Sequence, residues 1–182
     1  MTRIGPIDPD DAPEASRALA AEHEAAGARM TNMKWTAARS PETLAMLLTW
    51  YPLHDRVAAF LGERRAQLLS HAISAQNDCL ICSTFFRRLL VESGEDPDAL
   101  VLSDTDRTVV EFGRQLGRDA HGVSNELYSA LARLYSPEQI VALTAFGAIM
   151  LATNVFNNAL RVDLDGYLEP YRAAAVPPAG GR

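Results

Sequence analysis

Two cysteines, Cys79 and Cys82, stand three residues apart and are the chain's most reactive side chains. A thiolate at one position can attack a peroxide oxygen or a disulfide, and the second thiol can then resolve the product into an intramolecular disulfide. The three-residue spacing supplies this partner without a large backbone movement. The pair therefore predicts thiol redox chemistry.

Two other accounts of the pair stay open. Buried cysteine behaves as a small hydrophobic side chain, and the segment LICSTFF at residues 80–86 is apolar, so the thiols could be inert. A zinc site would need two more ligands, for which His54 and His71 are candidates only by elimination, because no second Cys or His pair stands at ligand spacing. We expect no metal and no other cofactor.

A predicted helix boundary lies just before the cysteines. Asn77 and Asp78 interrupt the helix predicted over residues 63–76, and we expect them to cap a second helix that begins at Cys79. The unpaired N–H groups and the dipole of a helix N-terminus favour negative charge, so both cysteines, in the first turn, should lose their protons more easily than a free thiol.

Proton transfer needs a titrating group near the thiols, and His71 is the candidate. Gln67 and His71 share one face of the predicted helix over residues 63–76 at i, i+4 spacing. His71 titrates near neutral pH, although it could equally be a core or interface histidine that holds one hydrogen bond. Gln67 cannot titrate and can only orient a water or a partner. His23 and His121 lie in hydrophilic stretches and are predicted on the surface.

Helix signals recur along the whole chain, and no stretch shows the alternation of a strand. Ser136-Pro137-Glu138-Gln139 is a capping box with proline at the first helical position, and Pro52 is predicted to interrupt a helix that begins at Ser40. The fold class is all-α, with seven or eight helices. They are predicted over residues 11–27, 40–50, 53–61, 63–76 and 79–94, and from residues 103, 124 and 136 onward. Residues 1–10 are predicted as an N-terminal arm, 11–168 as a single domain and 169–182 as a C-terminal tail.

Net charge and its distribution along the chain limit the classes of partner that the protein can bind. The chain has 182 residues and a net charge of -6, and no basic block stands out, which argues against nucleic acid. The N-terminal sequence has no apolar signal region, so we expect a cytoplasmic protein, in which a close cysteine pair stays reduced most of the time.

The segment between Glu138 and Arg161 carries no charge and is near the length that spans a bilayer. It contains several Thr and Asn residues and opens with a soluble-helix cap. We therefore expect a helix buried inside the protein or in an oligomer, and no membrane partner.

Three stretches resemble the carboxymuconolactone decarboxylase superfamily and, within it, the peroxidase-related branch of the alkylhydroperoxidase D-like proteins. They are NMKWTAARSPETLAML at residues 32–47, AQNDCLIC at 75–82, and LSDTDRTVVEFGRQL at 102–116 followed by SPEQIVALTAFGAIMLATNVFNNALRVDLDGY at 136–167. The resemblance implies an all-helical protein that assembles into trimers or hexamers. It also implies that Cys82 attacks peroxide and that Cys79 resolves the product.

Three family positions differ in this chain. The resemblance places a glutamate of the family's proton relay at Gln67, a histidine at Phe86 and a frequent histidine at Ile81. General acid and base help is worth roughly 10²–10⁴ in rate. Without the usual relay, His71 has to take over proton handling, or the protein is a slow peroxidase, or the thiols serve another reaction.

The predicted function is a thiol-dependent peroxidase in which Cys82 attacks, Cys79 resolves, His71 assists and Gln67 positions. Its substrate is a hydroperoxide, hydrophobic if Phe85, Phe86 and Ile81 line the pocket, and its reductant is a dithiol or a protein. The alternative is a catalytically degenerate member of the same fold that acts as a redox-responsive or small-molecule-binding oligomer. Lactone decarboxylation fits poorly, because few polar acid–base groups lie beside the cysteines.

Overall fold

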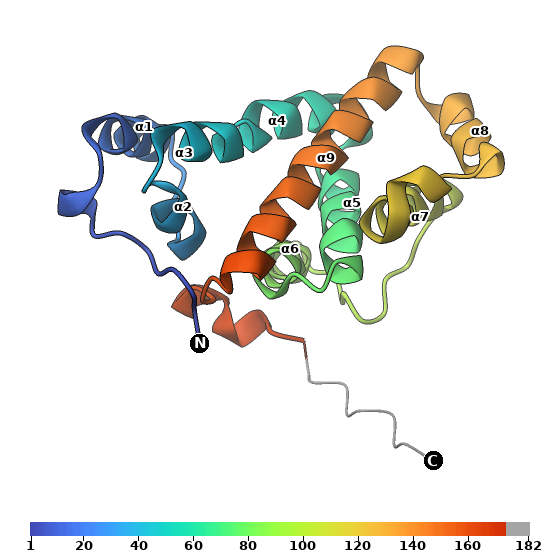
Figure 1. The fold of residues 1–182 in the computed structure, drawn as a ribbon. Helices are drawn as coiled ribbons and strands as arrows, with labels where there is room; N and C mark the ends of the chain where they lie inside the picture. Colours follow the sequence, from blue (N-terminus) through green and yellow to red (C-terminus); the bar gives the residue numbers. More distant parts are fainter. Residues whose placement is uncertain (174–182) are drawn as a thin grey trace.

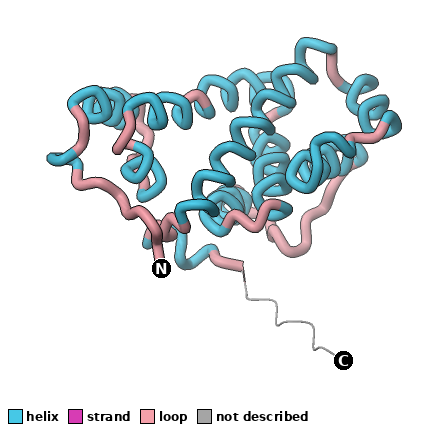
Figure 2. The backbone as a smooth tube through the Cα atoms, viewed as in Figure 1, coloured by secondary structure: helices cyan, strands magenta, loops and turns pink. Residues whose placement is uncertain are grey.

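A computed structural model describes residues 1–173, which form nine α-helices, three short 3-10 helices and no strand (Figures 1 and 2). The predicted all-α class is confirmed. The α-helices are α1 (Glu14–Ala25), α2 (Asn32–Ala37), α3 (Pro41–Leu48), α4 (Trp50–Leu61), α5 (Glu63–Gln76), α6 (Leu80–Glu92), α7 (Asp104–Asp119), α8 (Asn125–Leu134) and α9 (Pro137–Leu160). The 3-10 helices are η1 (Pro9–Asp11), η2 (Ala120–Gly122) and η3 (Gly166–Tyr171).

The C-terminal helices begin where their caps predict. The hydroxyl oxygens of Ser103, Ser124 and Ser136 each accept a hydrogen bond from the backbone N–H three residues on, at 3.2–3.3 Å. Ser103 and Ser136 form full capping boxes. These starts are fixed by interactions within one turn, so the local sequence suffices to place them.

Two features of the N-terminal half differ from the prediction. Helix α2 was not predicted from the residue pattern, because its six residues are too few to show a period; Thr31 caps it by accepting from the Lys34 N–H. Pro52 does not interrupt a helix. Helix α4 begins at Trp50, which places Pro52 in the first turn, where a missing N–H costs no intrahelical hydrogen bond.

Helix α5 is central and packs against α4, α6, α7 and α9. Its contact with α7 is close because α7 presents two glycines: a Cβ on Gly113 would lie 2.9 Å from the carbonyl oxygen of Leu69, and one on Gly117 would lie 2.8 Å from that of Ile73. Both distances are below van der Waals contact. The glycines therefore allow α5 and α7 to approach backbone to backbone.

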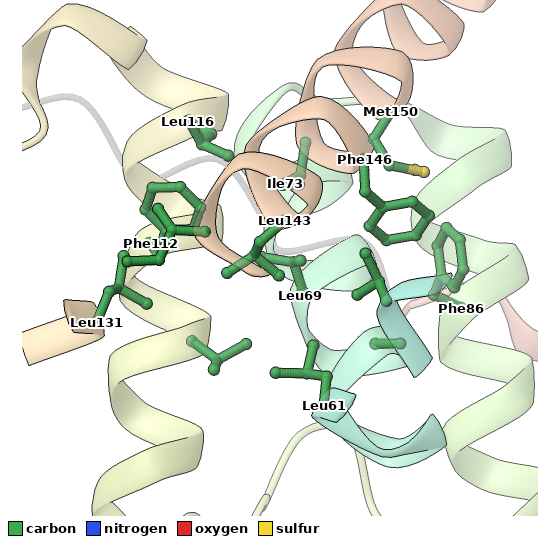
Figure 3. Close-up of a cluster of buried hydrophobic side chains, with 14 of the residues drawn as sticks. Leu61, Leu69, Ile73, Phe86, Phe112, Leu116, Leu131, Leu143, Phe146 and Met150 are labelled. Carbon is green, nitrogen blue, oxygen red and sulfur yellow. The ribbon is translucent and has the colours of Figure 1, made fainter. Parts of the chain in front are cut away.

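The main hydrophobic core lies between α4, α5, α6, α7, α8 and α9 (Figure 3). It includes Phe86, Phe146 and Met150, and both cysteines belong to it. A second, N-terminal core cluster joins α1, α2 and α3 and includes Leu47. Helix α4 runs from the N-terminal helices towards α5 and α9 (Figure 1).

The two ends of the described chain lie against the fold. The Arg3 N–H donates to the Leu160 carbonyl at 2.9 Å, so the predicted N-terminal arm contacts the end of α9. Helix η3 packs on α6, and the Tyr171 hydroxyl donates to Glu92 at 3.1 Å. Of the tail predicted from residue 169 onward, residues 174–182 lie outside the described part.

Candidate active site

Cys79 and Cys82 flank the start of α6, and both are free thiols. Cys79 is the N-cap residue, whereas Cys82 lies in the first turn. The prediction that Asn77 or Asp78 caps this helix was wrong: Asp78 adopts a left-handed conformation (φ 50°), and the Asn77 amide donates to the Gly117 carbonyl at 2.7 Å. A cysteine therefore occupies the position where a capping side chain normally sits.

Asn157, on α9, is the polar residue in contact with both sulfurs. Its side-chain amide donates to the Cys82 Sγ at 3.4 Å and to the Cys79 Sγ at 3.8 Å. Its Oδ1 is buried and has no hydrogen-bond partner among the described residues. The amide thus brings positive charge density from α9 to both thiols.

The two thiols differ in how easily each loses its proton. A hydrogen bond from Cys82, backbone N–H groups at the start of α6 and the Asn157 amide lower the pKa of Cys79 to about 7, against its burial. Donation to Cys79 and burial raise the pKa of Cys82. When the pair loses its first proton, the negative charge therefore falls on Cys79, and Cys82 keeps its proton.

A cavity of about 100 Å³ opens beside Cys82 and lies between the two core clusters. Cys82 is on its wall, whereas Cys79 has no exposed surface and lies behind it. Ile81, Phe85 and Phe86, the residues predicted to contact substrate, all line this cavity. Access and charge thus favour different cysteines: Cys82 faces the cavity, and Cys79 holds the thiolate.

Aromatic and sulfur-containing side chains form much of the cavity wall. Trp50 lies with its ring centroid 6.2 Å from that of Phe86, and Phe85 packs edge-on to Phe86 at 5.1 Å. The Trp50 indole N–H donates to the Met150 sulfur at 2.9 Å. A molecule bound beside Cys82 therefore meets mainly apolar surface.

Lys34 gives the same cavity a charged side chain, which is only 6% exposed. Its ammonium donates to the Arg29 carbonyl at 2.5 Å and to the Tyr51 hydroxyl at 2.7 Å, and its Nζ lies 2.6 Å from the His23 Nε2. An ammonium has three N–H donors. All three are used, and His23 accepts as a neutral imidazole.

Burial controls the titration of this cluster. Desolvation lowers the pKa of Lys34 to about 8, although Asp165 and Glu24 oppose the shift, and desolvation together with Lys34 lowers the pKa of His23 to about 4. Desolvation also raises the pKa of Tyr51 to about 12. Near neutral pH the cluster therefore contains a lysine cation, a neutral histidine and a protonated tyrosine.

Asp165 and Tyr167 complete this side of the cavity. Asp165 Oδ1 accepts the Asn32 N–H at 2.9 Å, and its Oδ2 is buried without a partner among the described residues. Burial raises the pKa of Asp165. Asn32 and Asp165 come from the first and last of the stretches that carry the family resemblance, so the fold brings those stretches together around the cysteines.

Solved structures with the same architecture identify the fold. No protein-family model and no curated protein sequence matches the chain. A peroxidase-related protein from Ralstonia eutropha JMP134, described as an alkylhydroperoxidase core, superposes with a TM-score of 0.72 at 17% identity, over 92% of this chain and 94% of that one. The chain has the alkylhydroperoxidase D-like fold.

A debrominase, Bmp8, shares this fold. Its ligand-free structure superposes with a TM-score of 0.71 at 18% identity, over 94% of this chain and 96% of that one. A cysteine-to-alanine variant of Bmp8, solved in complex with 2,3,4-tribromopyrrole, superposes equally well at 17% identity. The alkylhydroperoxidase D-like fold therefore includes proteins described by more than one chemistry, and the fold alone does not choose between them.

His71 and Gln67 do not line the cavity beside Cys82. His71 lines a second cavity, of about 510 Å³, with Asp98 and Arg114, and desolvation lowers its pKa. The Gln67 amide donates to Glu63 at 3.1 Å on the same helix. The sequence predicted that both act beside the thiols; the fold brings together the cysteines and the apolar residues but places these two elsewhere.

Several residues of the site were not predicted from sequence, among them Lys34, Tyr51 and Asn157. Lys34 and Asn157 fall inside the stretches that carry the family resemblance. The resemblance therefore indicated that these stretches matter, but it gave neither residue a role. Tyr51 had no signal. His23 was predicted on the surface, which was wrong: it is buried because Lys34, from α2, supplies a hydrogen-bond partner that the local sequence does not show.

Neither a metal centre nor a membrane helix explains the site. Within residues 1–173, no group of three or more His, Cys, Asp or Glu side chains is placed to hold a metal ion. By length and composition, α9 is the one helix in this range that could cross a membrane, and 33% of its most apolar window is buried. Leu143, Phe146 and Met150 of α9 belong to the main core, so one face of the helix lies in the fold's interior.

Proposed function

We propose that the protein is a thiol-dependent peroxidase in which Cys82 attacks a hydroperoxide and Cys79 resolves the product. The observation that carries this proposal is that the two sulfurs occupy different positions relative to the cavity. Cys82 lines the cavity and so meets the substrate, whereas Cys79, buried behind it, accepts the hydrogen bond of Cys82. Cys79 is thus the base for the neighbouring thiol, and the family's glutamate is not needed for that step.

The reaction balances with these two residues. As the Cys82 proton passes to Cys79, the Cys82 sulfur attacks the terminal oxygen of the hydroperoxide, the O–O bond breaks, and an alkoxide leaves. The peroxide gains two electrons, and Cys82 becomes a sulfenic acid. The Cys79 thiol then attacks the Cys82 sulfur, which forms the disulfide and releases water. A dithiol or a protein reductant restores both thiols.

The apolar wall favours hydrophobic hydroperoxides. Trp50, Phe85 and Phe86 line the cavity with aromatic surface. An alkyl or aryl group buries this surface away from water, whereas hydrogen peroxide has no apolar group to do so. We therefore expect an organic hydroperoxide to react faster than hydrogen peroxide. A cytoplasmic setting would keep the pair reduced between turnovers.

The test is reduction of tert-butyl hydroperoxide driven by dithiothreitol. Cys82→Ser should abolish turnover. Cys79→Ser should also stop turnover but should still form, more slowly because the base is lost, a Cys82 sulfenic acid that a dimedone probe traps. Wild-type protein with no activity above background on either hydrogen peroxide or tert-butyl hydroperoxide would overturn the proposal. Rapid Cys79–Cys82 disulfide formation without turnover would instead support the redox-responsive alternative.

Reductive debromination is the second candidate. The observation that favours it is an aromatic-lined cavity beside a cysteine in a fold that the debrominase Bmp8 shares. The same dithiol supplies the two electrons: a bromoarene and two thiols give the arene, hydrogen bromide and a disulfide. Bromide release from 2,3,4-tribromopyrrole, lost in Cys82→Ser, would support this candidate, and its absence in a preparation active on hydroperoxides would exclude it.

A further inference from the structure

Peroxide reduction at Cys82 leaves a basic alkoxide inside the cavity, which needs a proton. This inference rests on the proposed peroxidase function. The family resemblance places the relay at positions that are Gln67 and Phe86 here, and neither side chain can supply a proton. His71 lines the other cavity. Cys79 carries the proton taken from Cys82, but it has no exposed surface and lies behind the cavity wall. The donor that meets the leaving oxygen therefore belongs to another part of the wall beside Cys82.

Two tyrosines line that wall, Tyr51 and Tyr167, and within residues 1–173 Tyr51 is the one whose hydroxyl contacts the Lys34 ammonium. Its oxygen accepts a hydrogen bond from the Lys34 ammonium at 2.7 Å, and the hydroxyl has no hydrogen-bond acceptor of its own among residues 1–173. Lys34 cannot donate further, because Arg29, His23 and Tyr51 occupy its three N–H groups. Tyr51 and Cys82 line the same cavity.

We propose that Tyr51 is the acid that protonates the leaving oxygen and that Lys34 is the positioning residue that holds and polarises the Tyr51 hydroxyl. The catalytic step forms one O–H bond on the product alcohol and breaks the O–H bond of Tyr51. The phenolate that remains lies 2.7 Å from the Lys34 ammonium, whose charge stabilises it. Tyr51 is half-buried, so water returns the proton after the product leaves.

The relative acidities allow this transfer. Burial raises the pKa of Tyr51 to about 12, which still lies well below the pKa of water and of the alcohol that an alkoxide becomes when it is protonated. A hydroperoxide with a weakly basic leaving group needs no such help. Peracetic acid releases acetate, whose conjugate acid has a pKa of about 4, like a side-chain carboxyl. Acetate therefore leaves without being protonated. The need for Tyr51 should therefore depend on the leaving group.

The other polar groups around Lys34 do not replace Tyr51. His23 is neutral and accepts from the Lys34 ammonium, and the Arg29 contact is a backbone carbonyl. Asp165 lies near Lys34 and Arg29, and its Oδ1 accepts the Asn32 N–H. Asp165→Asn is the variant that tests whether the carboxyl, rather than Tyr51, supplies the proton.

The experiment is single-turnover oxidation of reduced protein, followed by loss of free thiol, with tert-butyl hydroperoxide and with peracetic acid. Tyr51→Phe keeps the ring and removes the hydroxyl. We expect it to slow the reaction with tert-butyl hydroperoxide by roughly 10²-fold or more and to leave the peracetic acid rate within about twofold of wild type. Tyr128→Phe, the same change at an exposed position on α8, is the matched control and should alter neither rate.

Three outcomes would overturn the proposal. Equal losses with both oxidants in Tyr51→Phe would show that Tyr51 only shapes the cavity, and an unchanged rate with tert-butyl hydroperoxide would show that it gives no proton. A leaving-group-dependent loss in Asp165→Asn, absent from Tyr51→Phe, would assign the proton to the carboxyl. Wild-type protein inert to both oxidants would overturn the peroxidase function itself, which is a distinguishable result.

Lys34→Met tests the positioning role separately. It removes the charge that stabilises the phenolate, so we expect the same selective loss with tert-butyl hydroperoxide, smaller than that of Tyr51→Phe. Adding Lys34→Met to Tyr51→Phe should cause little further loss, because both changes act through one hydroxyl. Additive losses would contradict a positioning role.

Discussion

The side-chain amide of Asn157 lies 3.4 Å from the Cys82 sulfur and holds α9 against the first turn of α6. The same amide reaches the Cys79 sulfur, so one donor serves both thiols. The Asn157 amide does not titrate, so its hydrogen bonds to the thiols are available at every pH. Asn157 should therefore set how easily the pair loses its first proton.

Replacing Asn157 by Leu should raise the pKa of the first thiol, which lies at about 7 on Cys79. Loss of one hydrogen bond to a charged group corresponds to about 1.5–3 kcal/mol, or about one to two pKa units. Ultraviolet absorbance of the thiolate, followed over pH, measures the shift. Asn125→Leu, the same change at an exposed position on α8, is the control, and equal titrations of the two variants would contradict the role of Asn157.

The rate of peroxide reduction should rise and then fall with pH. Formation of the thiolate raises the rate as pH increases through about 7, and loss of the Lys34 proton lowers it above about 8. The profile with tert-butyl hydroperoxide should therefore be a narrow bell. Lys34→Met should remove the alkaline limb and keep the acid limb; a wild-type profile that stays flat above pH 8 would contradict this assignment.

His71→Gln should leave single-turnover oxidation by tert-butyl hydroperoxide within about twofold of wild type. His71 lines the cavity shared with Asp98 and Arg114, and Cys82 lines the other one, so its imidazole does not meet the leaving oxygen. The sequence makes His71 the proton-transfer candidate because it stands near the cysteines along the chain. A loss as large as that of Tyr51→Phe would restore that role.

Residues near each other in sequence allowed the thiol half of the site to be predicted, whereas the proton half depends on tertiary contacts. Cys79, Cys82 and the apolar residues after them belong to one helix start, so spacing and helix signals suffice to place them. Lys34 and Tyr51 lie on α2 and α4 and meet only through packing. No helical period connects two residues on separate helices, and a buried lysine is uncommon enough that Lys34 reads as a surface residue.

The same distinction explains the helix boundaries. A serine cap acts within one turn, which is why the starts of α7, α8 and α9 follow from sequence. Helix α2 has six residues and is stabilised by contacts with α3. Such a short helix is marginal in isolation, so its formation depends on packing that a local pattern does not contain.

Gly117→Ala should destabilise the protein by about 1–3 kcal/mol in spite of the better helix propensity of alanine, which is worth about 1 kcal/mol. The new Cβ would lie 2.8 Å from the Ile73 carbonyl oxygen on α5, and a backbone atom cannot move aside without shifting the helix. Urea-induced unfolding followed by circular dichroism measures the change. An unfolding free energy equal to or above that of wild type would show that α5 and α7 separate easily.

The exposed face of α9 should pair with a second copy of the chain. Val141 is 69% exposed and Val155 is 60% exposed, on a helix without a charged side chain between Glu138 and Arg161. Such a face is costly to leave in water, and its lack of charge fits an identical face better than an acidic or basic partner. We therefore expect a homo-oligomer, a trimer or a hexamer, that buries this helix.

Val141→Glu combined with Val155→Glu should shift the mass measured by light scattering towards that of the monomer. The carboxylates would have to be desolvated at the contact, which opposes association. Val101→Glu, on an 87% exposed residue outside α9, is the matched control and should leave the mass unchanged. A wild-type protein that is monomeric at micromolar concentration, or a double variant with wild-type mass, would show that this face of α9 is not the interface.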